Sequence, residues 1–312
     1  MANSRPRVNN AIKKQAREYQ EAHPGTHYTA AREAVLNTSI EPQWSPSPLD
    51  RIIGQPEAKK QLHAVYAKRQ FDIERNKRFG TSTACNPVRL FFVGPPGTGK
   101  STAAYALHDA LGTSEKFVQI GAYDLIGTHI GEPSRNVREV LDDVGKGTLV
   151  IDSVETLITV NESFRREVLA TLIENMPTCG NLIVSGYTWH IGMSEEARRF
   201  VRLLRIVQFD TITNSDAADL AVMFAKEECR ILSADALDAV CEVVSCARNK
   251  VDESGMNTLD LRGNVRFVRS LVESARHRAD YRLAGKHGDN TVSISDDELV
   301  TITAEDVPRW FK

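Results

Sequence analysis

The chain has 312 residues, of which 41% are hydrophobic and 26% charged, and its formal net charge is −2. These proportions are those of a folded globular protein, so wholesale disorder, collagen-like repetition and a simple coiled coil are excluded. The near balance of 39 basic and 41 acidic residues leaves no global field that would recruit nucleic acid or a membrane surface. The length predicts about two domains of roughly 150 residues each.

The sequence carries no signal for export or membrane insertion. No apolar segment follows the polar start of the chain, and no stretch approaches the roughly 18 apolar residues that span a bilayer. The five cysteines are scattered and lack the Cys-x-x-Cys spacing of zinc or redox sites, so we expect reduced core thiols. We therefore expect a cytoplasmic protein with no membrane span.

Residues 1–47 differ from the rest of the chain because they hold no long apolar run. Helical spacing predicts one short helix at about residues 9–22 and a second that starts near Thr29. The three prolines within residues 42–48 favour an extended linker over a helix or strand. We predict a boundary at this linker, with residues 1–47 forming a short helical N-terminal segment.

From residue 49 onward, short apolar runs alternate with stretches of helical length. The runs at residues 89–93, 116–120, 148–151, 181–185 and 205–209 predict buried strands. This alternation is typical of a parallel sheet with helices on both faces, which we assign to residues 48–210. Residues 211–312 instead predict successive helices with hardly a strand between them, with Asn214 or Ser215, Ser233 and Asn264 as N-caps.

The strongest motif is Gly94-Pro95-Pro96-Gly97-Thr98-Gly99-Lys100-Ser101, which matches the G-x-x-x-x-G-K-[ST] pattern of a Walker A phosphate loop. Its position between an apolar strand and a helical stretch is the context that such a loop needs. Glycines let backbone N–H groups point at the phosphates, and the helix N-terminus adds a favourable dipole. We predict that Lys100 reaches the outer phosphates, that Ser101 binds Mg²⁺, and that Thr102, at the start of the helical stretch, also belongs to the nucleotide-binding residues.

A carboxylate follows another apolar strand about 50 residues later. Asp152 ends the run Thr148-Leu149-Val150-Ile151-Asp152, the Walker B pattern that supplies a magnesium ligand beside a phosphate loop. The alternative is a carboxylate that caps the next helix.

Further motifs resemble the AAA+ ATPases of the CbbX, SpoVK and EccA group, which includes red-type Rubisco activase and the type VII secretion ATPases. The resemblance covers roughly residues 48–308. It is carried by Ile52-Ile53-Gly54-Gln55, Leu125-Ile126-Gly127-Thr128-His129-Ile130-Gly131, Val137-Arg138-Glu139-Val140-Leu141, Leu182-Ile183-Val184-Ser185-Gly186-Tyr187 and Gly263-Asn264-Val265-Arg266-Phe267-Val268-Arg269.

This resemblance implies an AAA+ P-loop NTPase αβα domain with a parallel sheet and a C-terminal helical lid domain, which clamp ATP or ADP with Mg²⁺. It assigns Ile53 and Gly54 to adenine packing, Tyr187 to the nucleotide site, and Arg266 to the sensor 2 position. A solvated lid arginine is the alternative for Arg266.

The resemblance also implies a ring, usually a hexamer, in which a neighbour supplies an arginine finger. Arg202 is the best candidate for that finger, with Arg198, Arg199 and Arg205 as competitors, and a surface helix with solvated arginines is the alternative. The resemblance also places His129 and Ile130 at the position of the family's pore loop, which grips a threaded chain.

Two positions depart from the family pattern. Ser153 stands where relatives carry the Walker B Glu that orients the attacking water, and losing such a base typically lowers rate by roughly 10² to 10⁴. Glu155 is the candidate replacement. His129 stands where relatives carry an aromatic residue; a histidine can still stack there, and a loop histidine without a role is the alternative.

Two functions remain open. The first is an ATPase that remodels or assembles a protein partner, recruited through residues 1–47 or the ring pore, with a secretion-type role preferred over carbon fixation. The second is a hydrolysis-impaired, ATP-bound switch or scaffold in a homo- or hetero-oligomeric ring. A role on DNA is disfavoured because the chain lacks a basic domain or a nucleic-acid motif.

Overall fold

The computed structural model describes residues 47–80, 86–112, 115–129, 131–187, 194–253, 255–288 and 294–310, together with Arg17, Gln20, Glu21 and His27. By internal contacts the chain divides into two compact units, Met1–Pro46 and Ser47–Lys312. In the first unit Arg17, Gln20 and Glu21 are helical, and the remainder of the two helices and linker expected there lies outside the described residues.

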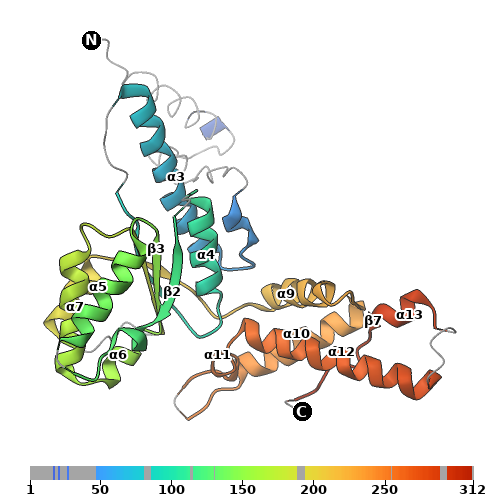
Figure 1. The fold of residues 1–312 in the computed structure, drawn as a ribbon. Coiled ribbons are helices and arrows are strands. Elements are labelled where there is room, and N and C mark those ends of the chain that lie inside the picture. The colour runs from blue at the N-terminus through green and yellow to red at the C-terminus, as the bar shows by residue number, and fades with distance from the viewer. Residues whose placement is uncertain are drawn as a thin grey trace. The chain divides into compact units, whose positions relative to one another are not determined.

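Helices and strands alternate in the first part of the larger unit (Figure 1). In chain order they are η1 (Pro48–Arg51), α3 (Pro56–Phe79), β1 (Arg89–Val93), α4 (Lys100–Ala110), β2 (Phe117–Gly121), η2 (Ala122–Leu125), α5 (Glu132–Val144), β3 (Thr148–Asp152), α6 (Thr156–Thr159), α7 (Glu162–Asn175), β4 (Asn181–Gly186), α8 (Glu195–Arg202) and β5 (Arg205–Gln208). Each expected strand is therefore confirmed to within one residue at either end.

Across the described residues, five parallel strands form one sheet in the order β2-β3-β4-β1-β5. Because the strands are parallel, their carboxyl ends lie at the same edge of the sheet. Ligands of open α/β sheets bind outside this edge. The phosphate loop after β1, Asp152 at the end of β3 and Gly186 at the end of β4 all reach it.

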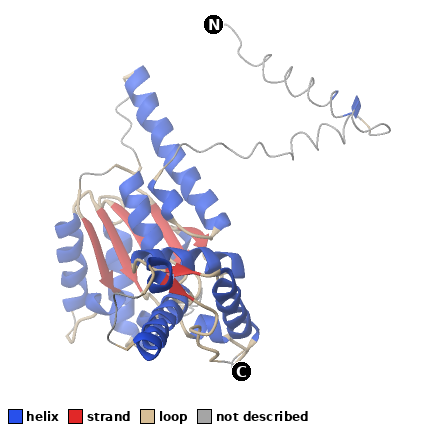
Figure 2. Cartoon of the chain, turned by 90° about the vertical axis from the view of Figure 1, so that its right-hand side faces the viewer, coloured by secondary structure: helices blue, strands red, loops and turns tan. Residues whose placement is uncertain are grey.

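Alternate side chains of each strand enter two different cores. Phe91 and Val93 of β1 pack with side chains of α5, α7 and α8, whereas Leu90 and Phe92 pack with those of η1, α3 and α4. Helices consequently cover both faces of the sheet (Figure 2). This explains why each strand is a continuous apolar run, since both of its faces are buried.

The rest of the chain is mainly helical. It contains α9 (Asn214–Glu227), β6 (Ile231–Leu232), α10 (Ala234–Asn249), α11 (Thr258–Leu261), α12 (Val265–His287), α13 (Asp296–Val300) and β7 (Thr301–Ile302). A separate apolar core joins α9, α10 and α12, and includes Leu220, Val240 and Leu271. We call this part of the chain the lid.

The structure corrects several details of the sequence-based expectations for the lid. Its first helix is capped by Thr213, whose hydroxyl accepts from the Asp216 N–H, and not by Asn214 or Ser215. Ser233 is confirmed as an N-cap. Asn264 precedes α12 but makes no side-chain cap bond. The short strands β6 and β7 pair with one another, which the sequence pattern did not indicate.

Two other chain-wide expectations can be compared with the described residues. Cys229 and Cys246 are exposed, so the prediction of core thiols is wrong for this pair. In the part of the chain that the structure describes, every helix is too short or too polar to cross a membrane.

Candidate nucleotide-binding site

The phosphate loop connects β1 to α4 in a conformation that depends on glycine. Gly97 and Gly99 have φ values of +68° and +93°, in the left-handed region where a Cβ is unfavourable. A Cβ on Gly97 would also lie 2.0 Å from the carbonyl oxygen of Gly263 in the lid. Gly99 is the N-cap of α4, so the loop ends at a helix N-terminus whose free N–H groups favour an anion.

Lys100 begins α4, and its ammonium group lies against the loop. Its Nζ donates to the carbonyl oxygens of Gly94 and Pro95 at 2.7 and 2.8 Å. Burial lowers the pKa of Lys100; Asp152 and Glu155 oppose this shift, and Arg266 adds to it. These influences mean that Lys100, two carboxylates and a lid arginine share one electrostatic environment.

Asp152 is held at the end of β3 by two donors. Its Oδ1 accepts from the Ser153 N–H at 2.8 Å and from the Ser185 hydroxyl. Ser185 is buried in β4, the neighbouring strand, and sequence reasoning missed its contact with Asp152. The available signal was its position at the carboxyl end of a strand. The two donors fix the carboxylate at the edge of the sheet where the phosphate loop lies.

Position 153 has an unusual backbone. Ser153 has φ of +57°, a left-handed conformation that is uncommon outside glycine, asparagine and aspartate. Two residues later, Glu155 turns back toward the sheet edge, where its Oε2 accepts from the Tyr187 N–H at 3.2 Å. The loop after β3 therefore presents a carboxylate from position 155, while position 153 offers only a hydroxyl.

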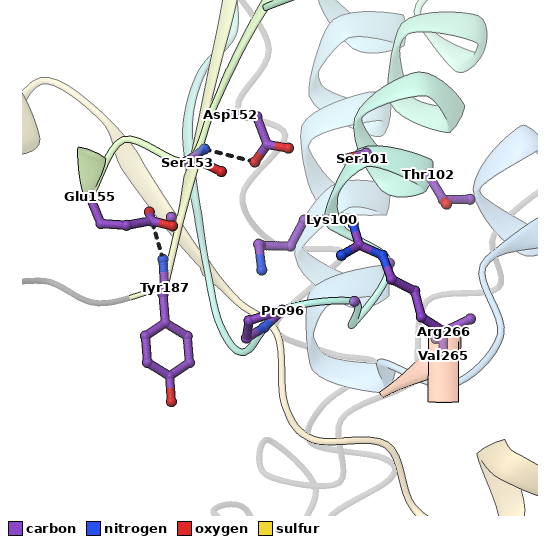
Figure 3. A pocket seen from close by; sticks show the side chains of 13 residues that line it. Pro96, Lys100, Ser101, Thr102, Asp152, Ser153, Glu155, Tyr187, Val265 and Arg266 are labelled. Carbon is purple, nitrogen blue, oxygen red and sulfur yellow. Dashed lines mark hydrogen bonds between the residues drawn. The ribbon is translucent and has the colours of Figure 1, made fainter. Parts of the chain in front are cut away.

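These groups line one cavity of about 320 Å³ (Figure 3). The lining residues are Pro96, Gly97, Gly99, Lys100, Ser101, Thr102, Asp152, Ser153, Glu155, Gly186, Tyr187, Val265 and Arg266. Gly186 and Val265 were not predicted from the sequence. A helix N-terminus, a lysine and an arginine suit a polyphosphate, while a hydroxyl and a carboxylate are oxygen ligands of the kind that Mg²⁺ takes.

The lid contributes to this cavity through the start of α12. Figure 3 shows the Arg266 side chain extending toward Lys100 and Ser101. The Val265 N–H donates to the Gly97 carbonyl oxygen at 3.1 Å, which joins α12 directly to the phosphate loop. The lid and the sheet edge thus form the two sides of the cavity.

Tyr187 lines the cavity at the end of β4, but its ring points away from Lys100 (Figure 3). Its hydroxyl contacts the Met256 sulfur in the lid. Burial, followed by Asp260 and Asp252, raises the pKa of Tyr187. Its backbone N–H donates to Glu155, which lines the same cavity.

Several predicted site residues lie outside this cavity. Ile53 packs against the lid core, and a Cβ on Gly54 would meet the carboxyl group of Asp216. Thr98 is buried and donates from its hydroxyl to the Pro95 carbonyl oxygen at 2.9 Å, so it shapes the loop. The described lining of the cavity therefore contains none of these three residues.

The remaining predicted residues lie on other surfaces. Arg202 lines a separate hollow on α8 with Glu195, Arg198 and Arg199. His129 is exposed before α5, with its Nδ1 3.4 Å from a carboxylate oxygen of Glu132. Ile130 lies outside the described residues.

The parallel five-stranded sheet, the phosphate loop after β1 and the helical lid define an AAA+ nucleotide-binding fold. Family comparison agrees: the model for the ATPase family associated with various cellular activities (AAA) matches residues 90–211, and the AAA lid domain matches residues 214–312. The chain belongs to the AAA ATPase family.

Its similar proteins include secretion-system components. ESX-3 secretion system protein EccA3 of Mycobacterium leprae is 29% identical over 89% of this chain and 45% of that protein. EccA3 of Mycolicibacterium smegmatis is 30% identical over 84% of this chain and 45% of that protein. ESX-1 secretion system protein EccA1 of Mycolicibacterium smegmatis is 27% identical over 89% of this chain and 49% of that protein. The chain therefore spans about half the length of these relatives.

Solved structures share the fold at lower sequence identity. The AAA domain of FIGL-1 has a TM-score of 0.57 at 18% identity, covering 83% of this chain and 80% of that one. The RuvB Holliday junction branch migration motor of Thermotoga maritima has a TM-score of 0.54 at 18% identity, covering 84% and 70%. These similarities concern the fold alone.

Proposed function

We propose that the chain binds ATP and ADP with Mg²⁺ in the cavity at the carboxyl edge of its sheet. The observation that carries the proposal is the convergence of the phosphate loop, Lys100, Ser101 and Asp152 on one cavity. In this proposal the loop N–H groups and Lys100 bind the phosphates, while Ser101 and Asp152 hold the metal. Arg266 adds positive charge from the lid.

We further propose that bound ATP is hydrolysed to ADP and phosphate, with Glu155 orienting or deprotonating the attacking water. Glu155 lines the same cavity as Lys100 and carries the carboxylate that Ser153 lacks. An arginine finger, with Arg202 as the first candidate, completes the site from a neighbouring copy in a ring, for which we propose a hexamer.

A second candidate function rests on position 153. A serine cannot accept a proton as a general base near neutral pH, and Glu155 is already bonded to the Tyr187 N–H. With that bond retained, the protein would hold ATP as a switch or scaffold in a homo- or hetero-oligomeric ring. Nucleotide binding is common to both candidates, and turnover separates them.

For the biological role, we propose remodelling or assembly of a protein partner, related to type VII secretion. The similarity to EccA3 and EccA1 supports this role, and residues 1–47 or a pore loop at His129 and Ile130 would meet the partner. A cytoplasmic location and the absence of a nucleic-acid partner are part of the same proposal.

The proposal is tested by titrating a fluorescent ADP analogue and measuring phosphate release with Mg²⁺ and ATP over a range of protein concentrations. Lys100→Ala should abolish nucleotide binding because it removes the cation at the phosphate loop. Lys59→Ala is the matched control, since Lys59 also donates to a carbonyl oxygen, that of Ile52, and does not line the cavity.

Turnover that rises with protein concentration supports the self-assembling ATPase. Tight binding without turnover favours the switch or scaffold. Unchanged nucleotide binding by Lys100→Ala would reject the assignment of the site.

A further inference from the structure

The chain passes from the sheet to the lid through a short segment whose backbone is held at nearly every residue. The Phe209 N–H donates to the Val93 carbonyl oxygen at 2.7 Å, which ends the pairing of β5. Asp210, Thr211 and Ile212 follow, and Thr213 caps the first lid helix. We call residues 210–212 the crossing segment.

The amide side chain of Gln55 binds both backbone groups of Asp210. Its Nε2 donates to the Asp210 carbonyl oxygen at 2.7 Å, and its Oε1 accepts from the Asp210 N–H at 2.9 Å. The side chain therefore pairs with Asp210 as a neighbouring strand would. Gln55 is 5% exposed and has φ of +55°.

The amide side chain of Asn264 binds the other end of the crossing segment. Its Oδ1 accepts from the Ile212 N–H at 3.2 Å. Its Nδ2 donates to the Pro96 carbonyl oxygen in the phosphate loop and to Asp260 Oδ1, both at 3.0 Å. Asn264 is fully buried, so one side chain joins the phosphate loop, the crossing segment and the lid.

Gln55 and Asn264 both have a positive φ, which is uncommon for residues with a side chain. Gln55 lies in the left-handed helical region with ψ of +50°, whereas Asn264 combines φ of +46° with ψ of −102°; a positive φ carries a strain for a residue with a Cβ. Such conformations persist when surrounding contacts determine them. Here the hydrogen bonds of the two amide side chains hold the backbone in place. Between them, the Thr211 hydroxyl donates to Asp260 Oδ1 at 2.8 Å.

We propose that Gln55 and Asn264 are positioning residues that fasten the two ends of the crossing segment, and that Asn264 transmits a change in the phosphate loop to the lid. Pro96, which Asn264 contacts, adjoins Gly97, which binds the Val265 N–H. A shift of the loop upon phosphate binding must stretch or relieve these two bonds. The transmission, unlike the fastening, rests on the proposed nucleotide binding.

The test is residue-resolved amide hydrogen exchange of the full chain. Each amide side chain accepts from one crossing-segment N–H, so its removal should release that N–H alone. Asn264→Gly should speed exchange at Ile212 by about tenfold or more while leaving Asp210 slow, and Gln55→Gly should do the reverse. Glycine is used because it tolerates a positive φ at both positions.

Asn257→Ala is the matched control. Asn257 also exchanges hydrogen bonds with Asp260, accepting from its N–H at 2.8 Å and donating to Oδ2 at 2.7 Å, but the structure gives it no bond to the phosphate loop or crossing segment. This variant should weaken the lid locally and leave exchange at Asp210 and Ile212 slow.

The transmission is tested by repeating the exchange with saturating Mg²⁺ and ADP. In the wild-type protein and Asn257→Ala, ADP should change exchange at the N-terminal amides of α9; in Asn264→Gly it should bind without that change. An equal response in Asn264→Gly overturns the transmission, and slow Ile212 exchange in that variant overturns the fastening. If the wild-type protein binds no ADP, the proposed function and the transmission both fail, while the exchange without nucleotide still decides the fastening.

Discussion

At the scale of single residues, position 153 is the one that separates the two proposed functions. Ser153 lines the cavity and donates its N–H to Asp152, but its side chain carries no carboxylate. Its φ of +57° carries a cost for every residue with a Cβ, serine included. The chemistry at this position can therefore be separated from the backbone strain by comparing two substitutions of the same size.

Ser153→Glu should raise the rate of phosphate release by about 10² or more, because it supplies a carboxylate beside Asp152 where a water can be oriented. Ser153→Gln is the control, since it carries the same steric and backbone cost without a basic group. Steady-state phosphate release at saturating Mg²⁺ and ATP measures the difference. Equal rates for the two variants would show that water activation at position 153 is not what restrains turnover.

Glu155→Gln should lower turnover by about 10² or more if Glu155 activates the water, with nucleotide affinity retained. Glutamine keeps an oxygen that can accept from the Tyr187 N–H, so the loop after β3 should hold its shape. Phosphate release and nucleotide affinity are both measured. The control variant is Glu174→Gln, an exposed position on α7. A full rate in Glu155→Gln would remove Glu155 from the reaction and leave the base unassigned.

A local motif predicts the phosphate loop and Asp152 correctly, but it does not predict where Ile53 and Gly54 lie. The phosphate loop and Asp152 reach the cavity as expected, because the motif specifies a strand, a glycine-dependent loop and a helix that are consecutive in the chain. Ile53 and Gly54 do not line it, since their location depends on packing against a lid more than 150 residues away. No short-range pattern encodes that packing.

At the scale of elements, the buried strands were easier to predict than the caps and short pairings of the lid. A strand covered on both faces is a continuous apolar run, whereas β6 and β7 are two residues each and leave no period to detect. The cap of the first lid helix lies before both expected positions, Asn214 and Ser215, because Thr213 and Asp216 form a reciprocal capping box. Asn264 is engaged in three tertiary hydrogen bonds and is not available as a cap.

The loop before α5 depends on the carboxylate at the first position of that helix. Glu132 Oε2 accepts from the Thr128 N–H at 2.6 Å and from the His129 N–H at 3.0 Å. These bonds, with the one from Thr128 the stronger influence, lower the pKa of Glu132 from 4.5 to about 2. The carboxylate is thus bound in its charged form, at the point where His129 enters the proposed pore loop.

The lowered pKa gives Glu132 a defined pH dependence. Because the folded-state pKa is below the unfolded value, its stabilising contribution is complete above about pH 4.5 and is lost as the pH falls toward 2. Glu132→Ala should therefore lower the unfolding temperature at pH 6, and its difference from wild type should shrink between pH 4.5 and 2.5.

Thermal unfolding at each pH measures the effect, with Glu139→Ala as the control. Glu139 lies on the same helix and is exposed, with an ion pair to Arg135 at 3.6 Å. If the unfolding temperature of Glu132→Ala stays below that of the wild type by the same amount down to pH 2.5, the charged carboxylate does not have this role in the loop.

At the scale of the whole molecule, the arginines of α8 are separated from the cavity that they are expected to complete. Arg202 shares its hollow with Arg198 and Arg199, and the described lining of the nucleotide cavity contains none of the three. An arginine that cannot serve its own site can serve that of a neighbour, where such a finger is worth roughly 10³ to 10⁵ in rate. In the proposed ring, catalytic competence would therefore belong to the assembly and not to a single copy.

Arg202→Ala should abolish most turnover while leaving nucleotide binding intact, because the substitution removes a group that acts only on a neighbour. Lys100→Ala should also abolish turnover, because it removes the phosphate-loop cation on the other side of the same interface. When the two inactive variants are mixed in equal amounts and allowed to assemble, about a quarter of the interfaces in a head-to-tail ring join an intact phosphate loop to an intact Arg202.

Phosphate release by the mixture should consequently recover to about a quarter of the wild-type rate. The same experiment with Arg198→Ala or Arg199→Ala shows whether another arginine of the helix has this role. If the mixture stays inactive although both variants enter the same assembly, Arg202 does not act across the interface, and its loss of turnover must arise within its own chain.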